Sequence, residues 1–327
     1  MEESGLVGKL GIVVGTRQSP LAVTQALIVI DMIRRRQGKN SSFDLKIKKI
    51  QSGETRVSKS SSSVDYSRKD LFTGAIDDAL KNGTIDVAIH SLKDVPSEIS
   101  EGIEIISFPK RASPLDVLVA RKGIPPSLGR LPKKAKVGTS SVRRAVQLRA
   151  FRPDLEIVEI HGNIETRIGK LEGTGLDAIV LAKAGLDRLK LANVNGRTLS
   201  KRVMLPAVGQ GCLALCILSN CDRRIKETVG SIDHPETRYS VLAERAFSRR
   251  LGGGCNVPIA ALGSVSRSEK EARESSDKSS LWRLHLDGLV ANNENSSVWR
   301  DTLFGPMKQA ESIGEELARR LEHVLKS

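Results

Sequence analysis

The chain has 327 residues, 39% of them hydrophobic and 28% charged, and its formal net charge at pH 7 is +14. One hydrophobic core rarely supports this length, so we expect two or three domains. No apolar stretch approaches the roughly 18 uninterrupted residues of a membrane span, which excludes an ordinary helical membrane protein. The positive charge favours an anionic partner, either nucleic acid, an acidic surface or a small polyacid. Aromatic residues make up only 3%, which leaves few stacking platforms for single-stranded nucleic acid.

Strand-like and helix-like segments alternate over the first two thirds of the chain. KLGIVVGT (9–16) is typical of a buried strand, and Ser19 with Pro20 predicts the start of a helix that ends before Gly38. Further strands are predicted at 44–50, 85–91, 135–140, 155–160 and 177–182, with helical stretches after them, one opening at Ser141. This alternation predicts an α/β fold with mostly parallel sheets, in two similar domains that divide near 109–114.

The pattern changes from about residue 231. A helix is predicted from Pro235 to Gly252, then strands in PIAALGSV (258–265) and LWRLHLDGLV (281–290), then a last helix through Leu317. These elements predict a small α+β domain with an antiparallel sheet. We therefore expect domain 1 at 1–111 and 207–230, domain 2 at 112–206 and domain 3 at 231–327. The Ser-rich segments 52–70 and 266–280 are predicted to be loops.

The four cysteines are too few for a disulfide scaffold. Cys212 and Cys216 lie in an apolar run, where we expect small buried residues. No Cys-x-x-Cys pair and no cysteine–histidine cluster with zinc spacing occurs, so we predict no metal site. Cys255 directly follows three glycines, and on its own it could be a buried filler, a metal ligand, a redox thiol or a covalent anchor.

Polar and basic residues follow the predicted strands where each strand ends. In chain order they are Arg17 and Ser19, Lys93 and Asp94, Ser141 with Arg143 and Arg144, Arg167, and Arg188. Ligands of open α/β sheets bind outside the carboxyl ends of the strands, so we expect these side chains to line one cleft. Arginine suits the bidentate recognition of carboxylates, which favours an acidic ligand.

Several of these residues also have a purely structural interpretation. Ser19 could simply cap a helix, Arg143 and Arg144 could be solvated, and Asp94 could be a turn residue. His90 closes an apolar run and is more typical of a core position than of a catalyst. A single carboxylate among so many cations, however, would stay ionised, and could stabilise a cationic intermediate or transfer protons.

Eight segments together resemble the porphobilinogen deaminase (hydroxymethylbilane synthase) family. They are TRQSPLAVTQA (16–26), HSLKDVPSE (90–98), VGTSSVRRAVQL (137–148), GNIETRIGKL (162–171), LAKAGLDRL (181–189), LPAVGQG (205–211), AERAF (243–247) and GGCNVPIA (253–260). They occur in the family's order and span nearly the whole chain. The resemblance implies two periplasmic-binding-protein-like α/β domains and a third domain that carries a cysteine.

The resemblance also implies a transferase of tetrapyrrole and haem biosynthesis. Such an enzyme joins four porphobilinogen molecules head to tail, releases ammonia at each addition, and frees linear hydroxymethylbilane by hydrolysis. It implies a dipyrromethane cofactor, which would be held by a thioether to Cys255. Asp94 matches the catalytic carboxylate that assists ammonia loss and stabilises an azafulvene-like cation, and Lys93 and Arg17 are the other catalytic candidates.

The remaining site residues also come from the resemblance. The residues matched to the cofactor are Cys255, Ser141, Arg143, Arg144, Lys93, Arg167, Arg188 and Asp94, and those matched to the substrate are Arg17, Ser19, Lys69, Arg167 and Arg188. The chain departs from the family pattern at His161, where arginine is usual, at Gly252, and in the active-site loop at 53–70 with the Gly74–Ala75 that follows. One carboxylate contact and the behaviour of the loop are therefore open.

Two other functions fit parts of the sequence. A two-lobed binding protein for a small polyanion would share the cleft without catalysis, but would not need Cys255. Nucleic-acid binding is disfavoured by the scarcity of aromatics. We expect porphobilinogen as the partner, no nucleic acid, no membrane and a monomer. The N-terminus has neither a secretory nor a transit-peptide pattern, so we expect a cytoplasmic protein, or one of a plastid-like organelle whose leader has been removed.

Overall fold

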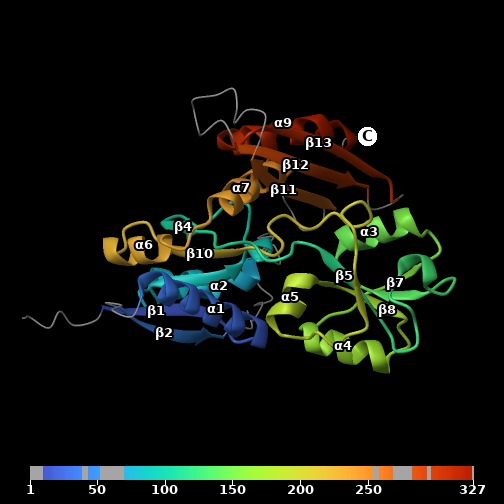
Figure 1. The fold of residues 1–327 in the computed structure, drawn as a ribbon, viewed down its shortest axis with the longest axis horizontal. Coiled ribbons are helices and arrows are strands. Elements are labelled where there is room, and N and C mark those ends of the chain that lie inside the picture. The colour runs from blue at the N-terminus through green and yellow to red at the C-terminus, as the bar shows by residue number, and fades with distance from the viewer. Residues whose placement is uncertain are drawn as a thin grey trace, which may run out of the picture. The chain divides into compact units, whose positions relative to one another are not determined.

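The computed structural model describes residues 10–38, 43–51, 70–252, 258–267, 282–292 and 296–325. The chain forms two compact units, each assembled from separate stretches (Figure 1). Unit 1 consists of Met1–His90, Ile99–Pro109 and Leu213–His234, and unit 2 of Ser91–Glu98, Lys110–Cys212 and Pro235–Ser327.

Unit 1 is built on a five-stranded sheet of order β2-β1-β3-β10-β4. Its strands are β1 (Leu10–Arg17), β2 (Phe43–Ile50), β3 (Val87–Ser91), β4 (Ile103–Ser107) and β10 (Leu213–Leu218), and its helices are α1 (Pro20–Gln37), α2 (Asp70–Lys81) and α6 (Arg223–Gly230). Strand β1 pairs in parallel with β2 and β3, whereas β10 and β4 are antiparallel. The sheet is therefore mixed, with its parallel strands at the N-terminal end of the chain.

The start of unit 1 follows directly from its sequence. Ser19 caps α1, since its hydroxyl accepts a hydrogen bond from the Ala22 N–H at 3.3 Å, and Pro20 occupies the first turn. Ala26, Val29 and Ile33 recur at helical spacing and are buried against the sheet. Apolar side chains of β1, β2, β3, β10 and α6 belong to the same core.

Unit 2 contains a second five-stranded sheet, of order β7-β6-β8-β5-β9. Its strands are β5 (Asp116–Ala120), β6 (Lys136–Gly138), β7 (Glu156–Val158), β8 (Ala178–Ala182) and β9 (Gly196–Thr198), and its helices are α3 (Val142–Phe151), α4 (Ile164–Gly173) and α5 (Lys183–Arg188). Strand β6 is parallel to β7 and β8, so the helices that follow these three strands begin at one edge of the sheet. Strand β5 runs antiparallel to β8 and β9.

The direction of β5 decides which side chain reaches that edge. Asp116, the first residue of β5, pairs with Ala182, the last residue of β8. The amino end of β5 therefore lies beside the carboxyl end of β8. An aspartate at the start of a buried strand is in this way brought to the edge where α3, α4 and α5 begin.

The C-terminal part of unit 2 is a small α+β arrangement. It contains α7 (Pro235–Arg250), the antiparallel strands β11 (Ile259–Arg267), β12 (Trp282–Ala291) and β13 (Val298–Pro306), and α9 (Ala310–Glu322). Phe247, Leu286 and Leu317 are fully buried in its core. Gly314 lets the two helices approach, because a Cβ there would lie 2.2 Å from the carbonyl oxygen of Ala243. The described residues also form 3-10 turns at Leu92–Asp94, Leu128–Arg130, Met307–Gln309 and His323–Leu325.

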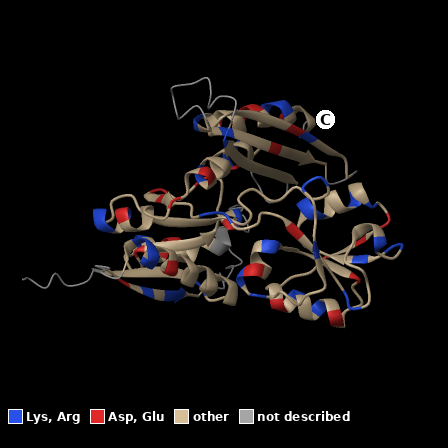
Figure 2. Cartoon of the chain, in the orientation of Figure 1, with Lys and Arg blue, Asp and Glu red and all other residues tan. Residues whose placement is uncertain are grey.

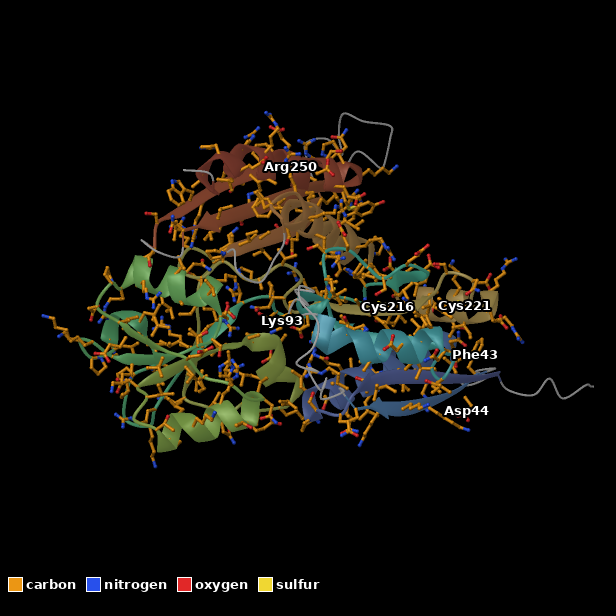
Figure 3. The ribbon with its side chains drawn as sticks, turned by 180° about the vertical axis from the view of Figure 1, so that it is seen from behind. Phe43, Asp44, Lys93, Cys216, Cys221 and Arg250 are labelled. Carbon is orange, nitrogen blue, oxygen red and sulfur yellow. The ribbon has the colours of Figure 1, made fainter. Side chains whose placement is uncertain are left out.

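The predicted fold class is confirmed, including the antiparallel sheet near the C-terminus. The elements that were not predicted are β4, β5, β9, β10, β13 and α6. The apolar run CLALCIL belongs mostly to β10, where Cys216 is buried, and Cys221 follows the strand (Figure 3). Lysine and arginine are spread over the helices and strands of both units (Figure 2). Among the described helices, none combines the length and apolar character that crossing a membrane requires.

Candidate functional site

Residues 91–98, here called the Asp94 loop, lie between β3 and the segment before β4. The loop carries Asp94 and Lys93, and Figure 3 labels Lys93. Lys93 and Asp94 lie in the 3-10 turn that follows β3, and the Val95 N–H closes this turn on the Leu92 carbonyl at 3.1 Å. The Leu92 N–H donates to the Cys212 carbonyl at 3.0 Å. The residues Lys93 and Asp94 are both half-buried, so they remain partly accessible at the surface of the fold.

Gly209 shapes the space beside this loop. Its φ of +69° is in the left-handed region, and a Cβ there would lie 2.7 Å from Cγ of the buried Leu92. Any side chain at this position would be strained and would displace the leucine that precedes Lys93. The glycine of LPAVGQG therefore lets the Asp94 loop lie against the 205–211 segment.

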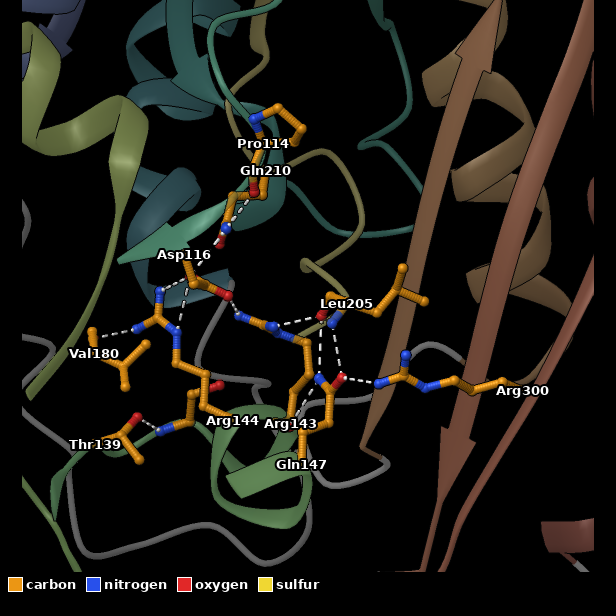
Figure 4. Close-up of polar contacts among 11 residues, drawn as sticks. Pro114, Asp116, Thr139, Arg143, Arg144, Gln147, Val180, Leu205, Gln210 and Arg300 are labelled. Atoms are coloured by element: carbon orange, nitrogen blue, oxygen red, sulfur yellow. Dashed lines mark hydrogen bonds and ion pairs between the residues drawn. The ribbon is translucent and has the colours of Figure 1, made fainter. Parts of the chain in front are cut away.

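Arg143 and Arg144, in the first turn of α3, share one carboxylate (Figure 4). Asp116 accepts from Arg143 Nη2 at 2.9 Å, and from Arg144 Nε and Nη2 at 3.2 and 2.7 Å. The remaining donors reach backbone carbonyls: Arg143 Nη1 donates to Leu205 and Arg144 Nη1 to Val180. Both guanidinium groups are thus oriented by charge-assisted hydrogen bonds on two sides.

Two glutamines extend this network. Gln210 Nε2 donates to Asp116 Oδ1 at 3.0 Å, so the carboxylate also holds the 205–211 segment. Gln147, one turn after Arg143, accepts from the Leu205 N–H at 2.7 Å and donates to the Leu205 carbonyl at 3.0 Å. Arg300 of β13 donates to the oxygen of Gln147 at 3.1 Å, which links the C-terminal sheet to α3.

The pKa values show which charges interact. Burial raises the pKa of Asp116, but the charges and hydrogen bonds of Arg143 and Arg144 outweigh it and bring the pKa to about 2. Burial lowers the pKa of Lys93, the carboxylates of Asp94 and Asp116 oppose that shift, and the two arginines add to it. Asp116 is therefore ionised at neutral pH and is the internal counterion of the arginine pair.

Arg167 joins the same group from α4. Burial and the charge of Arg144 both lower its pKa, and its Nε donates to the Gly162 carbonyl at 2.8 Å. Asn163 caps α4 by accepting from the Thr166 N–H at 2.8 Å. We call the six interacting side chains the cationic cluster; they are Lys93, Asp94, Asp116, Arg143, Arg144 and Arg167.

The other predicted residues lie around the cluster or elsewhere. Arg188 of α5 donates from Nη2 to the Gly211 carbonyl at 2.8 Å, next to the Cys212 carbonyl that holds the Asp94 loop. Ser141 occupies the N-cap position of α3, but its hydroxyl makes no capping hydrogen bond. His161 is exposed, with Nε2 3.0 Å from Oε1 of Glu159.

Arg17 and Ser19 belong to unit 1, at the end of β1 and the start of α1. The charge of Arg17 adds to the effect of burial on His90, whose pKa is lowered to about 4. His90 is 6% exposed, as expected of a core histidine. Lys69, Cys255 and nearly all of the 53–70 loop lie outside the described residues.

The interpretation of Arg143 and Arg144 as solvated residues is wrong, because each is only 7% exposed. The sequence prediction also missed Asp116, their common partner. A signal was present: an aspartate opens the otherwise apolar run DVLVA (116–120), and a charged residue in such a strand needs a partner. The partner could not be named without the direction of β5.

The chain matches two family models. Residues 12–227 match "Porphobilinogen deaminase, dipyromethane cofactor binding domain", and residues 238–323 match "Porphobilinogen deaminase, C-terminal domain". The chain belongs to the porphobilinogen deaminase family.

Curated members of the porphobilinogen deaminase family resemble the chain over most of its length. The protein of Moorella thermoacetica is 46% identical over 253 residues, covering 77% of this chain and 75% of that one. The protein of Pelobacter propionicus is 40% identical over 309 residues, covering 94% and 92%. The protein of Pelotomaculum thermopropionicum is 41% identical over 313 residues, covering 96% and 94%. Each carries the name porphobilinogen deaminase.

The cationic cluster suits an acidic group such as the cofactor for which the family's first domain is named. Lys93 interacts with the carboxylates of Asp94 and Asp116, Arg143 and Arg144 interact with Asp116, and Arg167 lies near enough to Arg144 to feel its charge. Four cations and two carboxylates leave positive charge in excess among these six residues. Arginine and lysine donors at a sheet edge bind carboxylates well. The residues present therefore fit a dipyrromethane cofactor that carries carboxylate groups.

Proposed function

We propose that this member of the family is a hydroxymethylbilane synthase. It joins four porphobilinogen molecules head to tail, releases ammonia at each addition, and frees linear hydroxymethylbilane by hydrolysis. The observation that carries the proposal is the placement of Lys93 and Asp94 in the same compact unit as Arg143 and Arg144, with Lys93 interacting electrostatically with each of the other three. A carboxylate surrounded by anion-binding side chains is what a reaction of an acidic substrate through a cationic state needs.

The cofactor, when bound, supplies the primer to which porphobilinogen units are added. We propose that it is attached by a thioether to Cys255 and that its carboxylates are held by Lys93, Arg143, Arg144, Arg167 and Arg188, with Ser141 nearby. Arg143 and Arg144 are supported in this role by Asp116, which fixes their orientation before any ligand arrives. Ser141 keeps its hydroxyl out of helix capping, which supports a contact with the ligand.

Asp94 is the proposed catalytic carboxylate. When the carbon–nitrogen bond of porphobilinogen breaks, the electron pair leaves with ammonia and a cation remains on the pyrrole, which the Asp94 carboxylate stabilises. The same carboxylate accepts the proton that is released when the new carbon–carbon bond has formed. Lys93 and Arg17 position the acidic side chains of the substrate, and Ser19 and Lys69 are further substrate contacts.

The domain boundaries are also part of the proposal. Domain 1 comprises 1–111 and 207–230, domain 2 comprises 112–206, and domain 3 comprises 231–327. The separate sheets of the three parts and the C-terminal family match at 238–323 support this division. The Asp94 loop falls in domain 1 by this division, although it packs with unit 2. Cys255 falls in domain 3, shortly after α7.

Two measurements test the function. The intact mass of freshly purified protein is expected to exceed the sequence mass by a dipyrrole, and this excess is lost in Cys255→Ser. Asp94→Asn is expected to retain the added mass and the fold while ammonia release from porphobilinogen falls at least about 100-fold. Glu172→Gln, on the exposed face of α4, is the matched control and keeps wild-type turnover. Unmodified wild-type protein that releases no ammonia would instead support the binding-protein alternative.

A further inference from the structure

The Asp94 loop is held from the C-terminal part of the chain. Arg245, on α7, donates from Nη2 to the carbonyl oxygens of Pro96 and Ser97 at 2.9 and 2.8 Å. Arg245 is only 8% exposed. These contacts join positions separated by 149 and 148 residues in the chain, and both partners lie in unit 2.

The two ends of the loop are fixed in different ways. Before Lys93, the Leu92 N–H is bound to Cys212 and the Leu92 side chain lies against Gly209. After Asp94, the carbonyls of Pro96 and Ser97 receive the Arg245 guanidinium. Lys93 and Asp94 lie between these two attachments, and Asp94 is two residues before the first carbonyl that Arg245 contacts.

The helix that carries Arg245 is itself firmly anchored. The neighbouring Glu244 is fully buried, accepts from Arg111 Nη2 at 3.1 Å, and also accepts from the N–H groups of Gly209 and Gly263 at 2.7 and 2.8 Å. Gly209 is the residue against which Leu92 lies. Glu244 therefore fixes the surface behind one end of the loop, while Arg245 binds the other end directly.

We propose that Arg245 is a positioning residue, which sets the place of Asp94 by holding the Pro96 and Ser97 carbonyls. The inference rests on the proposed function, because it takes Asp94 as the catalytic carboxylate. Arg245 contacts backbone carbonyls, so its removal changes where the carboxylate lies and leaves the carboxylate itself intact. Displacement of a catalytic group by about 1 Å can cost roughly 100-fold in rate.

A guanidinium suits this task better than other side chains. One nitrogen reaches two consecutive carbonyls, and burial among fixed partners limits its rotation. Lysine keeps the charge and can donate to the same oxygens, but from a single flexible ammonium. Methionine fills a similar volume and donates to neither.

The test compares Arg245→Met, Arg245→Lys and the control Arg249→Met in full-length holoenzyme. Arg249 lies one turn later on α7 and makes only surface pairs among its described contacts, the shorter with Glu311 at 3.5 Å. Arg245→Met is expected to lose about 10- to 100-fold in kcat with KM for porphobilinogen changed less than about twofold. Arg245→Lys is expected to recover at least half of that loss on a logarithmic scale but to remain slower than wild type, and Arg249→Met matches wild type.

Amide hydrogen exchange gives a readout that does not depend on activity. In Arg245→Met, exchange of the 91–98 backbone is expected to be at least about tenfold faster, with β6 and β8 unchanged.

Wild-type kcat in folded Arg245→Met, or no recovery in Arg245→Lys, would overturn the proposal. If Arg245→Met does not fold, slower turnover and faster 91–98 exchange in Arg245→Lys support the proposal, and wild-type values of both refute it. A wild-type protein without ammonia release refutes the proposed function, and the exchange rates then still decide whether Arg245 holds the loop.

Discussion

The carboxylate of Asp116 accepts two hydrogen bonds from the guanidinium of Arg144, at 3.2 Å from Nε and 2.7 Å from Nη2. Neither residue is exposed by more than 7%. The pair is therefore an internal ion pair at the edge of the unit 2 sheet, and Arg143 adds a second cation to the same carboxylate. Because one anion serves two buried cations, the stability of this region depends strongly on Asp116.

We expect Asp116→Asn to lower the free energy of unfolding by about 3 kcal/mol, since it leaves two buried guanidinium groups without a counterion. Urea unfolding at pH 7 measures the change. Asp187→Asn is the control, because Asp187 pairs with Lys183 on an exposed helix surface, and it is expected to change stability by less than about 0.5 kcal/mol. Equal effects of the two substitutions would contradict the assignment of Asp116 as the structural counterion.

His90 predicts a specific loss of stability in mild acid. Its pKa is lowered from 6.5 to about 4 in the folded protein, chiefly by burial and also by Arg17. As pH falls below 6.5 the unfolded chain gains this proton first, so the free energy of unfolding decreases until pH reaches about 4. Between these two pH values, the contribution of His90 lowers the free energy of unfolding by roughly 3 kcal/mol.

The measurement is the slope of unfolding free energy against pH between 6.5 and 4. His90→Gln is expected to flatten that slope, whatever its effect on stability at pH 7. His161→Gln should leave it unchanged, because that histidine is exposed. An identical slope in His90→Gln and wild type would mean that another group causes the acid sensitivity.

Gly162 controls the start of α4. Its φ is +116°, and a Cβ would lie 2.7 Å from Cγ2 of Thr166. Gly162→Ala is expected to cost about 1–3 kcal/mol in the free energy of unfolding and to disturb the Gly162 carbonyl that holds Arg167. Gly169→Ala, within α4 with open space around it, should instead stabilise by up to about 1 kcal/mol. Similar effects of the two would refute the role of the Gly162 backbone.

Glu244 and Arg111 form a further buried ion pair of unit 2. Glu244→Gln is expected to lower the free energy of unfolding by about 3 kcal/mol, because Arg111 is then left partly buried without a counterion. Adding Arg111→Met should restore part of the loss, since it removes the unpaired charge. Glu311→Gln at the surface is the control. A double variant that is as unstable as the sum of the single variants would exclude coupling between the two side chains.

Local signals in the sequence predicted the first strand and helix well. The cap at Ser19, the proline after it and the apolar spacing of α1 act within a few residues of one another. Strand β9 was missed because its three residues are all exposed, and β13 because polar and apolar residues do not alternate regularly along it. Helix α6 is short, and only its Asp222 cap marks its start.

The site was predictable only in part, for a geometric reason. Arg143, Arg144 and Arg167 follow parallel strands, so their common edge could be inferred from the order of elements. Asp116 reaches that edge because β5 runs the other way, and strand direction is not encoded within the strand. Arg245 could not be placed at all, because its partners lie nearly 150 residues earlier in the chain.

That separation has a consequence for how the protein is made. During synthesis, Pro96 leaves the ribosome long before Arg245, which is 149 positions later in the chain. At about 5–20 residues per second, the Asp94 loop waits on the order of 10–30 seconds for the helix that holds it. The nascent chain can fold the sheet of unit 1 only after β10 is made, and its Asp94 loop is completed later still. The Asp94 loop therefore receives its hydrogen bonds from Arg245 only after α7 has been made.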